Sequence, residues 1–141
     1  MIILDTSGLL AALDASESRH VQAADALRAS EGPRLLSPFV LAELDYLLTT
    51  RVSAAAARSL VAEVARGAYQ LELFDTDDVA AALGVLDRYP DLALGIADAS
   101  LVVLAARHQT TDILTLDERH FRAVRDSHGH AFRILPADRA A

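Results

Sequence analysis

The chain has 141 residues, a formal net charge of −7 and an apolar content of 52%, which together describe a single ordered globular domain spanning residues 1–141. Its thirteen basic residues are all arginine and it has no cysteine, so P-loop and Schiff-base lysines, disulfides, thiol nucleophiles and Cys-based zinc sites are excluded. The acidic balance argues against a generic, extended nucleic-acid binder, whose binding surface is normally basic.

The apolar pattern and the turn residues predict short strands that alternate with helices. In chain order, we expect a strand over residues 1–4, helices over 6–14 and 17–30, a strand at 35–36, helices over 38–50 and 54–66, a strand over 69–74, a helix from about 76 to 89, a helix containing Asp98, and strands over 112–115 and 132–135. Short apolar strands separated by helices imply an α/β fold, with a small central parallel sheet and helices on both of its faces.

The sequence shows neither a membrane-spanning segment nor a secretory signal, and both bear on where the protein is located. No apolar stretch reaches the roughly 18 residues that a membrane span needs. The N-terminus, Met1-Ile-Ile-Leu-Asp5, has neither the basic region nor the cleavage site of a secretory signal. We therefore expect a cytoplasmic protein with no membrane partner.

Four acidic residues stand in apolar surroundings. Asp5 follows the first predicted strand, Asp117 follows the strand over 112–115, and Glu43 and Asp98 lie inside apolar helical segments. A lone buried carboxylate costs several kcal/mol unless something compensates for it. In parallel sheets, ligands gather beyond the carboxyl ends of the strands. Four carboxylates drawn together there predict a divalent-cation site and metal-dependent phosphodiester chemistry.

Each carboxylate also has an ordinary structural explanation. Asp5, Asp98 and Asp117 are all suited to capping the helix that follows or contains them. At 100° per residue, Asp98 shares the core-facing side of its helix, which favours the site. Glu43 flanks the apolar stripe of its helix on one side and Asp45 flanks it on the other, so periodicity does not choose between them.

Other polar side chains adjoin these positions. The hydroxyls of Thr6 and Thr115 can hydrogen-bond the carboxylates or metal-bound waters, although both threonines also suit their local structure. Arg119, His120 and Arg122 begin a basic cluster directly after Asp117, and these side chains can bind RNA phosphates. A solvated helix face explains the same cluster.

Four motifs, in this order along the chain, resemble those of the PIN-domain nucleases, and specifically the VapC toxins of bacterial toxin–antitoxin pairs. They are Met1-Ile-Ile-Leu-Asp-Thr-Ser7, Ser37-Pro-Phe-Val-Leu-Ala-Glu-Leu44, Leu94-Gly-Ile-Ala-Asp-Ala-Ser100 and Leu114-Thr-Leu-Asp-Glu-Arg-His-Phe121. The resemblance covers nearly the whole chain and selects Glu43 over Asp45. It implies a PIN-like fold in which Asp5, Glu43, Asp98 and Asp117 are both catalytic residues and metal ligands.

The resemblance also implies an activity. It is that of a Mg²⁺-dependent endoribonuclease, with Mn²⁺ as a possible substitute, that acts as the toxic component of a type II toxin–antitoxin system. Such toxins inhibit translation by cleaving loops of structured RNA, either the sarcin–ricin loop of ribosomal RNA or tRNA. The implied partners are RNA, a second copy of the chain and a VapB-type antitoxin, in a heterotetramer or larger complex. A catalytically inactive PIN-like module that binds RNA or protein is the alternative.

Overall fold

The computed structural model describes residues 1–139, which build an α/β fold around one five-stranded sheet. All strand pairs in this sheet are parallel, in the order β3-β2-β1-β4-β5. The strands are β1 (Ile2–Leu4), β2 (Arg34–Leu36), β3 (Gln70–Leu71), β4 (Asp112–Leu114) and β5 (Arg133–Leu135).

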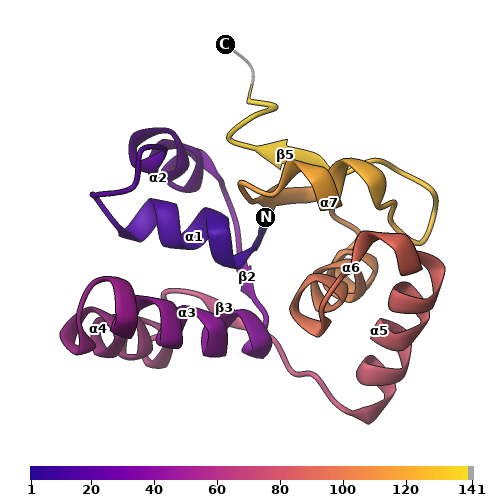
Figure 1. Cartoon of the computed structure of the whole chain (residues 1–141), viewed down its shortest axis with the longest axis horizontal. Coiled ribbons are helices and arrows are strands. Elements are labelled where there is room, and N and C mark those ends of the chain that lie inside the picture. The colour runs from indigo at the N-terminus through magenta and orange to yellow at the C-terminus, as the bar shows by residue number, and fades with distance from the viewer. Residues whose placement is uncertain (140–141) are drawn as a thin grey trace.

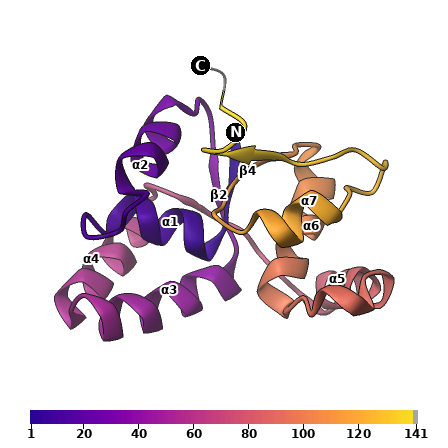
Figure 2. The ribbon, with the colours of Figure 1, turned by 45° about the horizontal axis from the view of Figure 1, so that its top comes forward.

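The helices form two groups, one on each side of the sheet (Figures 1 and 2). The first group is α1 (Thr6–Leu13), α2 (His20–Ala29), α3 (Pro38–Arg51) and α4 (Ala54–Ala65), and the second is α5 (Thr76–Arg88), α6 (Ile96–His108) and α7 (Glu118–Ala123), with a 3₁₀ turn at Pro90–Leu92 before α6. This arrangement confirms the predicted parallel sheet with helices on both faces. None of the helices in the described part of the chain is long and apolar enough to cross a membrane.

The core sits on the central strands. Ile3 of β1 lies beside Leu35 of β2 and Ile113 of β4, and all three side chains are fully buried. Because helices cover both faces, every position of β1 is apolar instead of every second one. This explains why the strands read as short continuous apolar runs in the sequence.

Two predicted elements are shorter in the structure by four residues each, whereas the others differ from their predicted bounds by a residue or so. The strand expected over 69–74 is only Gln70–Leu71, because the chain then turns away toward α5: Leu73 is 87% exposed and its carbonyl accepts a hydrogen bond from Arg107 Nη1 at 2.8 Å. The helix expected over 17–30 begins at His20. A turn precedes it, in which the Asp14 side chain accepts from the backbone N–H of Ser16 at 3.0 Å.

Helix α1 lies unusually close to the end of β4. A Cβ atom added at Gly8 would lie 2.3 Å from the carbonyl oxygen of Leu114 and 2.7 Å from the backbone nitrogen of Thr115. Only glycine leaves room for this approach. The contact brings the first turn of α1 against the segment that leads from β4 to Asp117.

Candidate metal and active site

The strand register places several polar residues at one level of the sheet. Leu4 pairs with Leu36 and with Leu114, so the residues that follow them, Asp5 and Thr115 among them, leave the sheet side by side at its carboxyl edge. Asp5 Oδ2 accepts a hydrogen bond from Thr115 Oγ1 at 2.6 Å, and Asp5 Oδ1 accepts from the backbone N–H of Thr6 at 2.8 Å. Asp5 is therefore both the N-cap of α1 and a group at the strand ends.

Burial perturbs the ionisation of Asp5. Its residue is only 5% exposed, and loss of hydration raises the pKa of its carboxyl group to about 6, with smaller upward contributions from the charges of Asp98 and Asp117. The hydrogen bonds from Thr115 and Thr6 act in the opposite direction, because they stabilise the carboxylate. A bound cation would favour the charged form further.

Asp98 and Asp117 reach the same region from α6 and α7. Asp98 lies in the first turn of α6, where its Oδ2 accepts from the backbone N–H of Gly95 at 3.0 Å. Asp117 is the N-cap of α7, and its Oδ1 accepts from the backbone N–H of His120 at 3.1 Å. The capping roles and the shared location therefore coexist, since each cap engages one oxygen and leaves the second available.

Glu43 enters from α3. It is exposed, and its Oε1 accepts a hydrogen bond from Thr6 Oγ1 at 2.7 Å. This contact turns its carboxylate toward the start of α1. Asp45, two residues later on the same helix, is exposed and does not line the cavity that Glu43 lines. The structure thus separates two acids that periodicity left equivalent.

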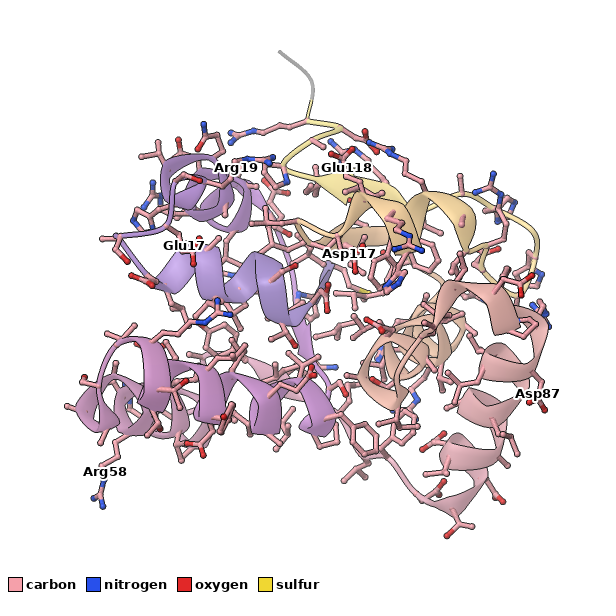
Figure 3. All side chains as sticks on the ribbon, viewed as in Figure 1. Glu17, Arg19, Arg58, Asp87, Asp117 and Glu118 are labelled. Carbon is pink, nitrogen blue, oxygen red and sulfur yellow. The ribbon has the colours of Figure 1, made fainter. Side chains whose placement is uncertain are left out.

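A single cavity of about 350 Å³ collects these side chains. In Figure 3 one of these acids, Asp117, lies near the middle of the molecule, between the two groups of helices. The charged residues that line the cavity are Asp5, Glu17, Glu43, Asp98, Asp117 and Arg51. Five acids against one arginine give the cavity a strongly negative character, which suits a cation.

The atoms that fit one cation most closely belong to Asp98 and Asp117, which line this cavity, and to His120, which lies beside them. One ligand atom from each lies within 4.8 Å of the other two. Asp5 and Glu43 line the same cavity but are outside this closest group. The donor set of carboxylates and one imidazole fits a divalent metal ion.

Comparison with known proteins places the chain in a family. Residues 2–126 match the model of the PIN domain. Ribonuclease VapC26 of Mycobacterium tuberculosis is 42% identical over 135 residues, which covers 96% of this chain and 100% of that protein. The chain belongs to the PIN-domain VapC toxins.

Solved structures show the same fold at low sequence identity. VapC20 of M. tuberculosis, described as a sarcin–ricin loop cleaving toxin, superposes with a TM-score of 0.77 at 23% identity, covering 83% of this chain and 90% of that one. A toxin–antitoxin complex from Klebsiella pneumoniae gives 0.66 at 18% identity, with coverages of 88% and 92%. VapBC2 of Rickettsia felis, bound to a DNA fragment from its promoter, gives 0.67 at 16% identity, with coverages of 95% and 98%.

The three side chains of the basic cluster in this VapC toxin differ in their contacts. Arg122 is paired with both oxygens of Asp138, at 2.7 and 2.8 Å, and with Glu118 at 2.8 Å, and these bonds raise the pKa of its guanidinium above the usual value. A phosphate would have to compete with two carboxylates for it. Arg119 is exposed and makes no ion pair within residues 1–139. The His120 ring turns toward the acidic cavity instead of toward solvent.

Sequence reasoning missed three residues of the toxin's site. Ser7 Oγ accepts from the backbone N–H of Leu116 at 3.0 Å and lies 3.4 Å from Asp5 Oδ2, so it joins α1 to the segment before Asp117. Glu17 and Arg51 line the cavity from the loop after α1 and from the end of α3. Only Ser7 carried a signal, as part of the first motif. Glu17 and Arg51 depend on tertiary packing that no local pattern reports.

Proposed function

We propose that this toxin is a metal-dependent endoribonuclease in which Asp5, Glu43, Asp98 and Asp117 are the catalytic and metal-binding residues. The supporting observation is their convergence on one cavity at the carboxyl ends of the strands, although they come from four separate segments of the chain. The place matches the general location of ligand sites in open parallel sheets.

The charge of the cavity explains why a cation is needed. A phosphodiester that approaches five carboxylates and one arginine is repelled, and neutralisation of the acids removes that barrier. A divalent ion held by these carboxylates would polarise the scissile phosphate and lower the pKa of a bound water. We propose Mg²⁺, with Mn²⁺ as a substitute, because carboxylates and water are ligands that both ions accept.

The protein's own contribution is to hold these carboxylates in place. Thr115 fixes Asp5 and Thr6 fixes Glu43 through hydroxyl donors at 2.6 and 2.7 Å. Both threonines therefore orient ligand groups, as expected of hydroxyls beside a metal site. The backbone caps at Asp98 and Asp117 do the same for the acids of α6 and α7.

We propose a loop of structured RNA as the substrate, with cleavage that inhibits translation. A cavity of this size accepts an exposed nucleotide more readily than a continuous duplex. The description of VapC20 as a sarcin–ricin loop cleaving toxin makes that ribosomal loop the first candidate, and tRNA is the second. Arg119 is the best placed of the basic cluster to contact a phosphate, because it is exposed and, unlike Arg122, makes no ion pair within residues 1–139.

The proposal includes the protein's assembly. We expect a homodimer, inhibited by a VapB-type antitoxin in a heterotetramer or larger complex. Support comes from the toxin–antitoxin complexes among the structural neighbours.

A cytoplasmic location is part of the same proposal, because ribosomes and tRNA are there. Residues 1–141 are proposed to form one PIN domain, in line with the single sheet in residues 1–139.

A matched pair of acids on α3 tests the activity. Glu43→Gln removes a carboxylate that lines the cavity, whereas Asp45→Asn removes an exposed one that does not. With total RNA and Mg²⁺, we expect cleavage by the wild type to be lost in EDTA, to fall at least about 100-fold in Glu43→Gln and to stay unchanged in Asp45→Asn. Mapping of the new RNA ends identifies the loop that is cut. RNA binding without cleavage would favour the inactive PIN-like module.

A further inference from the structure

The side chain of His120 is held over the acidic cavity by its own helix cap. Asp117 Oδ1 accepts from the His120 backbone N–H, which fixes the first turn of α7. The ring then folds back, so that its Nδ1 lies 2.8 Å from Asp117 Oδ2 and 3.9 Å from Asp98 Oδ2. A phosphate-binding side chain would point outward, and this one points at two carboxylates.

The ring nitrogen has an unusual environment. His120 Nδ1 is fully buried, yet within residues 1–139 no group forms a hydrogen bond with it, because the contact with Asp117 lacks hydrogen-bond geometry. Buried polar atoms without a partner are rare and costly, at about 1–3 kcal/mol each. When Nδ1 carries no hydrogen, its lone pair and a lone pair of the Asp117 carboxylate oxygen 2.8 Å away point into the same space. A cation between them resolves both problems.

The spacing of the three donors suits one ion. An octahedral ion with bonds of about 2.1 Å has neighbouring ligands about 3 Å apart and opposite ligands about 4.2 Å apart. The Nδ1–Asp117 distance of 2.8 Å is close to the spacing of neighbouring ligands, and the Nδ1–Asp98 distance of 3.9 Å is shorter than the spacing of opposite ligands, so one ion can reach all three donors. The other oxygen of Asp117 is used by the cap, so the oxygen nearest the imidazole is left for the ion. Asp98 Oδ2 accepts from the backbone N–H of Gly95, and its second lone pair is the one left for the ion.

We propose that His120 is a direct ligand of the divalent ion, through Nδ1, beside Asp98 and Asp117. This inference rests on the proposed metal site and adds to it a nitrogen donor. Imidazole favours transition-metal ions such as Mn²⁺, Co²⁺ and Zn²⁺, whereas Mg²⁺ prefers oxygen ligands. His120 therefore favours Mn²⁺ over Mg²⁺ at this site, while the carboxylates still accept the Mg²⁺ of the proposed function.

Metal binding tests the inference without reference to RNA cleavage. Mn²⁺ is titrated into the metal-free full-length protein, free Mn²⁺ is measured by electron paramagnetic resonance, and Mg²⁺ affinity is measured by competition. We expect His120→Ala to weaken Mn²⁺ binding at least about tenfold and Mg²⁺ binding by less than about threefold. His130→Ala, which removes an exposed imidazole of the turn after α7, is the matched control and leaves both affinities unchanged.

Pulsed electron paramagnetic resonance gives a readout that needs no substitution in the site. Mn²⁺ bound to the wild type should show a ¹⁴N coupling of a directly bound imidazole, which changes to a ¹⁵N coupling when histidine is ¹⁵N-labelled. The coupling should persist in His130→Ala. A wild-type complex without nitrogen coupling, or a His120→Ala variant that loses both ions equally, overturns the assignment of His120 as a ligand.

Asp98→Asn separates this inference from the proposed function. If Mn²⁺ binds to the wild type and not to Asp98→Asn, but no nitrogen coupling is seen, the carboxylate site stands and the His120 ligand is wrong. If neither Mn²⁺ nor Mg²⁺ binds to the wild type at millimolar concentration, both proposals fail. Circular dichroism of each variant confirms that it is folded.

Discussion

Asp5 is a residue whose proposed role opposes the stability of the fold. Its carboxyl group is buried, and its pKa of about 6 lies well above the value of 3.8 that it has when exposed. The native state therefore holds a proton that the unfolded chain releases between these two values. As the pH rises from 4 toward 7, the native state loses stability relative to the unfolded state, and the full penalty is present above pH 6.

Replacement of this acid should remove the penalty. In metal-free buffer, we expect the free energy of unfolding of Asp5→Asn, relative to that of the wild type, to increase by roughly 2–3 kcal/mol between pH 4 and pH 7. Urea denaturation at a series of pH values measures this difference. Parallel pH profiles for the two proteins would show that the carboxyl group is not perturbed in the native state.

Gly8 is the glycine at which the surrounding atoms leave the least room for a side chain. Gly8→Ala places a methyl group 2.3 Å from a backbone oxygen of β4, so α1 has to move away from the strand. We expect a loss of roughly 3 kcal/mol or more in the free energy of unfolding, since overpacking usually costs 1–3 kcal/mol and the obstacle here is backbone. Denaturant titration checks the value.

Gly84 on α5 provides the control for that substitution. No atom lies within 4 Å of a Cβ added at Gly84, and its backbone is helical. Gly84→Ala should stabilise the protein by roughly 0.5–1 kcal/mol, because alanine restricts the unfolded chain and favours the helix. Similar effects at the two glycines would contradict the close approach of α1 to β4.

At the scale of elements, two buried serines join the helices that carry Glu43 and Asp98. The backbone N–H of Phe39 donates to Ser37 Oγ at 3.2 Å, the two serine hydroxyls lie 2.8 Å apart, and Ser100 Oγ donates to the carbonyl of Ala97 at 2.6 Å. Ser37 therefore donates to Ser100. This chain of bonds links the start of α3 to the first turns of α6.

Breaking this link should weaken the fold. Ser100→Ala leaves the buried Ser37 hydroxyl without its acceptor, and we expect the free energy of unfolding to fall by roughly 1–3 kcal/mol. Ser59→Ala, at an exposed serine of α4, should change stability by less than about 0.5 kcal/mol. Thermal and denaturant unfolding of both variants provide the test, and an equal response would mean that the serine pair contributes nothing specific.

The elements also show what the sequence could and could not predict. Strand ends were predictable, because short apolar runs followed by Asp5 and by Leu116-Asp117 mark where the sheet stops. The strand over 69–74 was predicted too long, since the contacts of Arg107 that draw the chain away come from a distant helix. Glu43 could be chosen over Asp45 only through the resemblance to VapC toxins. The hydroxyl of Thr6, which turns Glu43 toward the cavity, comes from another helix.

The orientation of the His120 side chain could not be predicted from the sequence either. Its neighbours Arg119 and Arg122 suggested a phosphate-binding surface. The first turn of α7 instead directs the imidazole inward while Arg119 remains exposed. A six-residue helix that starts at an acidic cap can present both kinds of face, and which residue faces the cavity depends on how the helix sits on the sheet.

At the scale of the whole molecule, the excess of acid at one cavity predicts that metal binding stabilises the fold. An ion that binds only the native state adds RT ln(1 + [M]/Kd), or about 2.7 kcal/mol at a hundredfold excess over Kd. For a chain of this length that corresponds to a rise in Tm of roughly 8–12 °C. We expect Mn²⁺ to produce such a rise in the wild type, EDTA to reverse it, and Asp98→Asn to abolish it. An equal rise in Asp98→Asn would place the stabilising ion elsewhere.

The helix caps at Asp5 and Asp117 have a practical consequence for genetics. Each of these acids holds the first turn of a helix, so an alanine substitution at either position removes a fold-determining bond together with a charge. A loss of toxicity in such a variant can therefore reflect degradation of a poorly folded chain in the cell. Asparagine, which is also a good cap, separates the two effects. Toxicity screens that compare Asn and Ala variants, with protein abundance recorded for each, distinguish a folded but inactive toxin from one that is degraded.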